Sequence, residues 1–432
     1  MKKLLLSLAI AFGAINSGFA ADLYVNNSGQ SGTYTTIQAA INAASTGDNI
    51  FVSPLNTYQE SLSITKSIRI ASSLAGSRII VTQDIKISPL ANILVELIGI
   101  EGLDVILDTQ TSTLGPNTRG KAIISDCFFS DIDLGTNYLT ILVFKCNVSG
   151  SISGNHGKII GNTVDGDITI NDEPNIGIGD TVLIKANDVF KIVSYTDDHS
   201  VIIQNNKAHQ IYISNWKGGL LVNGLISNNT ILTEVPSNTQ GWNSPISGSY
   251  RIYITTSSSN SQQDMSNMEI VNNALICPAN NPNRAANSYN RQYYRHSFIN
   301  YAYATTNPVV AYNLYFKGNN ITGSYSYYYY GSAAGIFTKE VVNSTLSYPI
   351  SESDINNLLQ NTYKDLGSPS PKFQDTDLSR ADYGHRGGDN SYEAFHGTSA
   401  VLGKAYIIDL NLPSEIWPGQ TVNLKAEAVH TN

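Results

Sequence analysis

The stretch TTIQAAINAASTGDNIFVSP, residues 35–54, changes its hydrophobic period at Gly47. Before this glycine, apolar residues recur at helical spacing, at Ile37, Ala40, Ile41 and Ala44. After it, apolar and polar residues alternate, with apolar ones at Ile50, Val52, Leu62, Ile64, Ile68 and Ile70. Alternation with a period of two is typical of strands. The sequence therefore predicts one short helix followed by a chain built of strands.

The ends of this helix are marked by capping residues. Thr35 and Gln38 fit a capping box, in which both side chains satisfy backbone amides of the first turn. Gly47 suits the end of the helix because glycine adopts positive φ without a Cβ clash. We expect a helix over residues 35–44 with a narrow apolar face, which needs another surface to pack on.

A short unit recurs beyond this point: an apolar strand, then Asn or another small polar residue, then a further apolar residue. IIGNTV, IIQNNKA and LISNNTI are examples. The units are anchored on Asp126, Cys146, Asn162, Asn187, Asn206, Asn229, Asn273 and Asn319. The steps between these anchors are 20, 16, 25, 19, 23, 44 and 46 residues. The first five match one solenoid coil, and each of the last two is either two coils or one coil with a long insertion.

These repeats predict a parallel β-solenoid with a ladder of stacked asparagines. Each coil would pair with its neighbours, because an isolated coil cannot bury its apolar side chains. Asparagine suits a repeated bend, since its amide bonds to the next one and it tolerates left-handed backbone. An irregular β-sandwich with Asn in its turns is the alternative. A solenoid needs caps at its ends, and the helix of residues 35–44 is placed where the first cap belongs.

The segment YTTIQAAINAASTGDNIFVSPLNTYQESLSITKSIRI, residues 34–70, resembles the start of pectin-lyase-like right-handed parallel β-helix proteins. In that superfamily the cap helix is followed by Gly-Asp, a first strand and Tyr-x-Glu, here Tyr58-Gln59-Glu60. The resemblance covers residues 22–350 and implies an all-β, right-handed parallel β-helix. It implies little about activity, because the superfamily holds lyases, hydrolases, esterases and non-catalytic surface proteins.

The last part of the chain, residues 351–432, predicts a small C-terminal cap and a strand pair. Ser351 precedes a short helix with Ile355, Leu358 and Leu359 on one side. A turn-rich segment follows, and its stretch DYGHRGG, residues 382–388, resembles a closing motif of secreted bacterial β-helices. Two alternating strands then flank a turn at Pro418-Gly419. We expect residues 21–350 to form the solenoid.

Residues 1–20 have the pattern of a secretory signal, with Lys2 and Lys3, an apolar stretch, and Gly18-Phe19-Ala20 before a cleavage site. The apolar stretch is shorter than the ~20 residues of a membrane span, and no later segment qualifies. Without this peptide, 24 basic and 34 acidic residues remain, a net charge of −10, which disfavours nucleic acid as a partner. We therefore expect a secreted, extracellular or cell-surface protein. Cys127, Cys146 and Cys277 are too few for a disulfide framework and lack zinc-ligand spacing.

Motifs for glycoside hydrolysis are incomplete. NTVDGD, residues 162–167, resembles an Asn-Thr-Asp-Gly motif interrupted by a valine, and no Gly-His-Gly follows the pair Asp197-Asp198. Arg251-Ile252-Tyr253 lacks the lysine of Arg-Ile-Lys. The ordered aspartates and the Arg-x-Pro-x-x-Arg signature of pectate lyases are also absent. We expect no cofactor and find no calcium motif. Asp165, Asp167 and Asp197 are interpreted as turn residues.

One segment, NRAANSYNRQYYRHSFINYAY, residues 283–303, has side chains suited to an acidic glycan. Arginine pairs with carboxylates bidentately, and aromatic rings stack on sugars. It lies in the 46-residue step, and Trp242 lies in the 44-residue step before it. If both steps hold insertions on adjacent coils, they form the walls of one groove. The predicted binding patch is Trp242, Arg284, Tyr289, Arg291, Tyr293, Tyr294, Arg295 and His296.

The preferred interpretation is a protein that binds polysaccharide along the flank of the solenoid without strong catalysis. A lyase acting on a uronate-containing glycan is the first alternative, because lyases use Lys, Arg, Tyr or His to abstract a proton beside a neutralised carboxylate. A structural, adhesin-like spacer is the second. If the protein is an enzyme, a lyase is favoured over a hydrolase.

Overall fold

The computed structural model describes most of the chain, and the following account is confined to that part. The described residues are 20–88, 90–107, 120–135, 139–171, 181–195, 200–215, 223–232, 252–256, 263–264, 266–277, 299–301, 304–306, 309–318, 337–343, 350–375, 377, 379–388, 392–396, 405–411 and 425–430. No helix in these ranges has the length and apolar character needed to cross a membrane. The signal peptide predicted for residues 1–20 lies almost wholly outside them.

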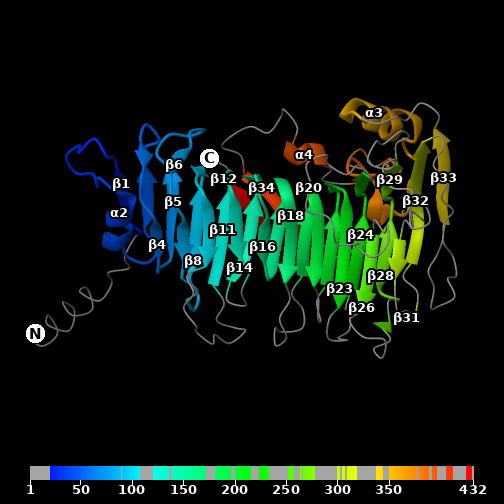
Figure 1. The fold of residues 1–432 in the computed structure, drawn as a ribbon, viewed down its shortest axis with the longest axis horizontal. Helices are drawn as coiled ribbons and strands as arrows, with labels where there is room; N and C mark the ends of the chain where they lie inside the picture. The colour runs from blue at the N-terminus through cyan, green and yellow to red at the C-terminus, as the bar shows by residue number, and fades with distance from the viewer. Residues whose placement is uncertain are drawn as a thin grey trace, which may run out of the picture.

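The chain forms a parallel β-helix whose coils stack along one long axis (Figure 1). Each coil passes through three strand positions, and equivalent strands of successive coils pair in parallel, so three sheets run along the axis and merge at the bends. Sheet 1 consists of β1 (Asp22–Val25), β2 (Asn49–Val52), β5 (Ile68–Ser72), β8 (Leu94–Ile98), β11 (Gly120–Ser125), β14 (Leu139–Phe144), β17 (His156–Ile160), β19 (Thr181–Lys185), β21 (Ser200–Gln204), β24 (Asn223–Ser227), β28 (Met268–Val271) and the start of β32 (Val309–Gly318).

Sheets 2 and 3 complete each coil, and the long strands β18, β20 and β32 bend from one sheet to the next. Sheet 2 consists of β3 (Thr57–Tyr58), β6 (Ile79–Val81), β9 (Ile100–Glu101), β12 (Phe128–Phe129), β15 (Asn147–Val148), the starts of β18 (Thr163–Asn171) and β20 (Asp188–Tyr195), β22 (Lys207–Ala208), β25 (Thr230–Leu232), β29 (Ala274–Cys277), the end of β32, and β33 (Phe337–Asn343). Sheet 3 consists of β4 (Leu62–Ile64), β7 (Ile85–Ile87), β10 (Asp104–Leu107), β13 (Asp131–Leu134), β16 (Ile152–Gly154), the ends of β18 and β20, β23 (Gln210–Asn215), β26 (Ile252–Thr256) and β30 (Ile299–Tyr301).

The period-two alternation of the sequence divides every strand into an inner and an outer side. In β13, Ile132 and Leu134 are fully buried inside the coil, whereas Asp131 and Asp133 are exposed outside it. The inner Ile, Val and Leu side chains of successive coils join into one continuous core along the axis. Burial of this core is the main stabilising contribution, because isolated coils have no apolar interior of their own.

The helix α2 (Ile37–Ala43) covers the first end of the solenoid, as predicted (Figure 1). Its cap differs from the prediction: Thr36, not Thr35, is the N-cap and accepts from the amide of Ala39. Glu60 satisfies two further amides, since its carboxylate accepts from Ile37 N at 2.7 Å and Gln38 N at 2.9 Å. Gln38 is therefore not the partner of a capping box. Instead, the Glu60 carboxylate of the Tyr-x-Glu motif accepts hydrogen bonds from amides of the first turn, which gives the motif a structural role at the helix.

The ladder of asparagines is present, with two corrections to its predicted members. Asn162, Asn187, Asn206, Asn229, Asn273 and Asn313 are buried and bond in sequence, each Nδ2 donating to the next Oδ1 at 2.9–3.0 Å. Asn313, rather than Asn319, ends this run, and Asn319 lies outside the described residues. At the other end, Cys127 rather than Asp126 has the ladder position beside Cys146, because Phe128 pairs with Asn147. Both thiols are buried and unbridged.

At each bend, the residue with left-handed backbone (positive φ) comes immediately before the residue that belongs to the ladder. Asn205, Asn228 and Asn272 have φ of 58°, 54° and 60°, and Asp126 has φ of 54°. One residue was expected both to adopt the left-handed backbone and to stand in the ladder. Because these are two adjacent residues, the Asp126 anchor was wrong by one position. The 44-residue step is a single coil with an insertion, because Asn229 bonds directly to Asn273.

After β33 the chain returns along the side of the solenoid (Figure 1). This segment, residues 350–396, is called here the C-terminal strap. It contains α3 (Glu352–Asn356), the π-helix η4 (Asn357–Thr362), the 3-10 helix η5 (Pro371–Phe373) and α4 (Tyr392–His396). The predicted helix after Ser351 is confirmed with its capping box to Asp354, and Ile355, Leu358 and Leu359 pack on sheet 2. The remaining elements are a short parallel pair, β27 (Gln263–Asp264) with β31 (Ala304–Thr306), and the antiparallel pair β34 (Ala405–Asn411) with β35 (Lys425–His430).

Candidate functional sites

The predicted patch of Trp242, Arg284, Tyr289, Arg291, Tyr293, Tyr294, Arg295 and His296 lies outside the described residues. The strands that flank the two insertions are described. Residues 233–251 connect β25 to β26, and residues 278–298 connect β29 to β30. Since β25 pairs with β29 and β26 pairs with β30, both insertions leave and re-enter the solenoid at equivalent points of adjacent coils. This geometry is the one that a shared groove requires.

A row of tyrosines follows the outer side of sheet 3 on the coils nearest to these insertions. Tyr212 of β23 is in register with Tyr253 of β26, and their ring centroids are 5.4 Å apart. Tyr195 of β20 meets Tyr212 edge-on at 6.2 Å. All three rings are partly exposed. Alternation explains the placement, because Ile211, Ile213, Ile252 and Ile254 fill the inner side of the same strands.

Sequence reasoning missed this row, although a signal was present. Tyr253 was considered only as part of an Arg-Ile-Lys motif, and Tyr195 and Tyr212 were not singled out. The signal is that each tyrosine stands at an outer position of the same sheet in consecutive repeats. It can be found only after the coils have been aligned on the correct ladder residues.

Charged residues continue the outer side of sheet 3 beyond the tyrosines. Asp167 is in register with Lys191, which lies with its Nζ 5.6 Å from the ring centroid of Tyr212. Burial raises the pKa of Asp167, and the nearby Lys191 charge opposes that rise. Asp165 and Asp167 were interpreted as turn residues, but both lie within β18. Asp197 lies outside the described residues.

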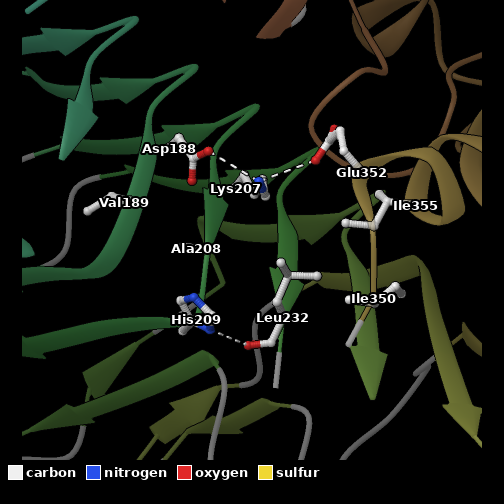
Figure 2. Close-up of a pocket in the computed structure, with 9 residues that line it drawn as sticks. All are labelled: Asp188, Val189, Lys207, Ala208, His209, Leu232, Ile350, Glu352 and Ile355. Carbon is white, nitrogen blue, oxygen red and sulfur yellow. Dashed lines mark hydrogen bonds and ion pairs between the residues drawn. The ribbon is translucent and has the colours of Figure 1, made fainter. Parts of the chain in front are cut away.

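A second candidate site is a pocket of about 250 Å³ between sheet 2 and the C-terminal strap. Figure 2 shows Lys207 at its centre, with Nζ 3.2 Å from both Asp188 Oδ2 and Glu352 Oε2. His209, which directly follows β22 of sheet 2, also lines the pocket, and its Nδ1 lies 3.1 Å from the carbonyl oxygen of Leu232. The remaining lining residues are Val189, Ala208, Ile350 and Ile355.

The charges of this pocket are already matched to one another. Burial lowers the pKa of Lys207, but the carboxylates of Asp188 and Glu352 raise it more, so its net shift is upward. A hydrogen bond from His385 and the charge of Lys207 lower the pKa of Glu352 to about 2, against the effect of burial. Lys207 is therefore held protonated and Glu352 ionised, which suits neither to general acid–base chemistry near neutral pH.

His385 anchors the strap beside this pocket. Its side chain is fully buried, with Nδ1 2.7 Å from Thr230 Oγ1 and Nε2 3.5 Å from Glu352 Oε1. Burial lowers the pKa of His385, so the ring is neutral at pH 7 and directs Nε2–H at Glu352. The arrangement stabilises the contact between the strap and the solenoid.

Three carboxylates of the strap could together hold a cation: those of Asp365, Asp375 and Asp382, which lie within 4.8 Å of one another. Their hydrogen bonds instead shape the predicted closing motif. Asp375 accepts from the amides of Asp382 and Gly388, and Asp382 Oδ1 accepts from Asp365 N at 2.6 Å. Burial and the neighbouring acids raise the pKa of Asp375 to about 6. Backbone amides thus already donate to several of the carboxylate oxygens that would have to coordinate a metal ion.

Comparison with protein-family models, with curated proteins and with solved structures finds no match in any of the three. The assignment to a parallel β-helix therefore rests on the strand pairing itself.

Proposed function

We propose that this protein is an exported β-helix of the pectin-lyase-like type that binds a polysaccharide along the outer side of sheet 3. The single observation that carries the proposal is the tyrosine row of Tyr195, Tyr212 and Tyr253. Aromatic faces provide large, rigid and partly polar contact area, and a row along the solenoid axis would contact successive units of an extended polymer. The predicted signal peptide supports the extracellular location.

The two insertions at residues 233–251 and 278–298 adjoin the same strands. Because both re-enter sheet 3, at β26 and β30, the predicted patch would extend the tyrosine row rather than form a separate site. The polymer would then run along sheet 3 towards the insertions. The right-handed winding is part of the resemblance and belongs to the proposal.

Binding without strong catalysis is favoured over a lyase reaction. Two candidate bases at the polar pocket are engaged within the protein, since Lys207 is ion-paired and the neighbouring Tyr392 donates to Asp188 Oδ2 at 3.3 Å. Burial raises the pKa of Tyr392 far above its ordinary value, which disfavours the phenolate that a tyrosine base requires. In a spacer without ligands the tyrosines would serve only as cross-strand pairs that stabilise the sheet, and their replacement would then leave glycan retention unchanged.

The test is retention of the purified protein on affinity gels that contain neutral, anionic or amino-sugar polysaccharides. Tyr212→Ala and Tyr253→Ala should each weaken binding to the retained glycan roughly tenfold. Tyr24→Ala is the matched control, because Tyr24 is an exposed tyrosine of sheet 1 that also stacks on a neighbouring ring. Equal retention of all variants would refute the proposal. Release of an unsaturated product, seen as a rise in ultraviolet absorbance, would replace it by the lyase alternative.

A further inference from the structure

The outer side of sheet 3 has an acidic half on the coils before the tyrosine row. Asp104 of β10 is directly in register with Asp131 of β13. Asp84 precedes Ile85, which pairs with Val105, so it is the neighbour of Asp104 on the other side. Two positions further along β13, Asp133 faces Ser153 of β16. Aspartates thus occupy three successive coils at the same outer position.

Polar and charged residues on the outer side of sheet 3 connect these aspartates to the tyrosine row. Ser151 stands next to Asp131, and its hydroxyl accepts from the amide of Asp167 at 3.1 Å. Asp167 is in register with Lys191 on the next coil, and Lys191 in turn contacts the ring of Tyr212. The outer side of sheet 3, over its described residues, therefore carries Asp84, Asp104, Asp131, Asp133 and Asp167 against Lys86 and Lys191.

Four of these carboxylates have no basic side chain in register with them, whereas Asp167 is faced by Lys191. Within the described ranges, none of the five forms an ion pair with a lysine or arginine at 4.0 Å or less, and Asp131 and Asp133 are exposed. Burial, together with repulsion from Asp131 and Asp84, raises the pKa of Asp104. Like charges directly opposite each other in adjacent strands are destabilising, so this arrangement reduces stability unless a cationic group is added.

The tyrosine row already contacts one cation of the protein itself. The ammonium group of Lys191 already lies 5.6 Å from the ring centroid of Tyr212. Attraction between an ammonium group and the face of an aromatic ring is a recognised basis for binding cationic ligands. A ligand amine would make the same kind of contact with an aromatic face of the row that Lys191 does not cover, while the rings also contact the apolar side of a sugar.

We propose that the polysaccharide bound by sheet 3 is an amino-sugar polymer with free, protonated amines. The inference rests on the proposed function, because the tyrosine row supplies the sugar contact. Complementary charge raises association rates and disfavours like-charged competitors. A uronate polymer would be repelled by the acidic half, whereas protonated amines would meet one aspartate on each of the coils of β7, β10 and β13.

The test compares three oligosaccharides of equal length: a glucosamine oligomer, its fully N-acetylated form and an oligogalacturonate. Binding is measured by titration calorimetry in mildly acidic buffer at low and high salt. The glucosamine oligomer should bind about tenfold more tightly than the N-acetylated form, and added salt should remove most of that difference. The oligogalacturonate should bind most weakly.

Variants separate the two halves of sheet 3. Asp131→Asn with Asp133→Asn should weaken glucosamine binding about two- to fivefold and leave binding of the N-acetylated oligomer unchanged. Asparagine keeps the Oδ1 acceptors that bond to Ser151 and Ser153, so the fold is retained. Glu101→Gln, an exposed carboxylate of sheet 2, is the matched control and should change neither affinity.

Equal or tighter binding of the N-acetylated or uronate oligomer would overturn the amino-sugar inference. In that case a loss of binding in Tyr212→Ala would still uphold the proposed function. If Tyr212→Ala binds every oligomer as the unmodified protein does, the proposed function falls and the inference falls with it.

Discussion

Asn205 and Asn206 are consecutive in the chain and bond in opposite directions. Asn205 Nδ2 points outward and donates to the carbonyl oxygens of His385 and Gly387 in the C-terminal strap. Asn206 Nδ2 points along the interior and donates to Asn229 Oδ1 at 3.0 Å. Asn228 and Asn272 repeat the outward role, bonding to Asp382 O and Ser368 N. The second asparagine of each pair thus belongs to the ladder that joins the coils, and the first holds the strap.

The inner ladder should contribute strongly to stability. Asn206→Ala removes the acceptor for Asn187 N and Nδ2 and leaves the carbonyl oxygen of Ile184 without its donor. Because each buried polar group without a partner costs about 1–3 kcal/mol, we expect a loss of at least about 2 kcal/mol in the free energy of unfolding. Chemical denaturation measures it. Asn147→Ala, at an exposed strand position, is the control and should be nearly neutral.

The strap should depend on close backbone contact at its closing motif. Gly384 has φ of 78°, and a Cβ there would lie 2.5 Å from Thr230 Oγ1 and 2.7 Å from Leu359 Cδ1. Gly32 has a similar φ of 81° with open space around it. Both Gly→Ala changes add backbone strain, but only Gly384→Ala adds a clash. We expect Gly384→Ala to be more destabilising by about 1–3 kcal/mol, and thermal unfolding of the two variants isolates that difference.

Two carboxyl groups of the strap should give opposite dependences of stability on pH. Glu352, faced by Lys207, His385 and Arg386, has a folded pKa of about 2, below its ordinary 4.5. Its contribution is present above the unfolded pKa and is lost as pH falls towards 2. Glu352→Gln should remove that acid-side loss. An unchanged acid limb in the unfolding profile would contradict the assignment.

Asp375 should act in the other sense. Its folded pKa is about 6, above its ordinary 3.8, and Asp377 and Asp382 are the neighbouring acids. The protonated form is therefore favoured in the folded protein, and its contribution, complete below pH 3.8, is lost as pH rises through 6. Asp375→Asn should flatten stability between pH 4 and pH 6 and raise it at neutral pH. Denaturation midpoints across this range test it, and a steeper dependence in the variant would contradict it.

Removal of the predicted signal peptide should strengthen the first coil. The nitrogen of Ala21 lies 2.7 Å from Asp48 Oδ1, and Asp48 is 6% exposed. Cleavage after Ala20 would convert this amide into an ammonium group beside a carboxylate, and a charged donor makes a stronger hydrogen bond. The form that begins at Ala21 should be more stable than one with an additional residue, by about 1 kcal/mol. The difference should vanish in Asp48→Asn, and N-terminal sequencing of the exported protein should begin at Ala21.

The coil could be predicted from the sequence because its signals are local. The alternation around Ile132 and the helical spacing around Ile41 each follow from neighbours within a few residues. The predicted register failed at Asp126, since the left-handed residue and the ladder residue are adjacent and either one fits a local pattern. At the other end the left-handed residue before Asn313 is Tyr312, with φ of 53°, so the local Asn-rich pattern pointed to Asn319 instead. The cap at Thr36 was missed for another reason. Two further amides of the first helical turn, those of Ile37 and Gln38, donate to Glu60, and sequence spacing alone does not specify that contact.

The sequence by itself determined that this chain is a β-solenoid with an apolar interior, a capping helix and repeated asparagines at its bends. Each of these features repeats within one coil, so elementary periodicity reveals it. Only the tertiary structure decided which outer side chains align, because alignment depends on the length of every preceding coil. It placed Tyr212 beside Tyr253, 41 positions apart, and returned His385 to Thr230, 155 positions away. The stacking of coils, rather than any local preference, brings such distant residues together.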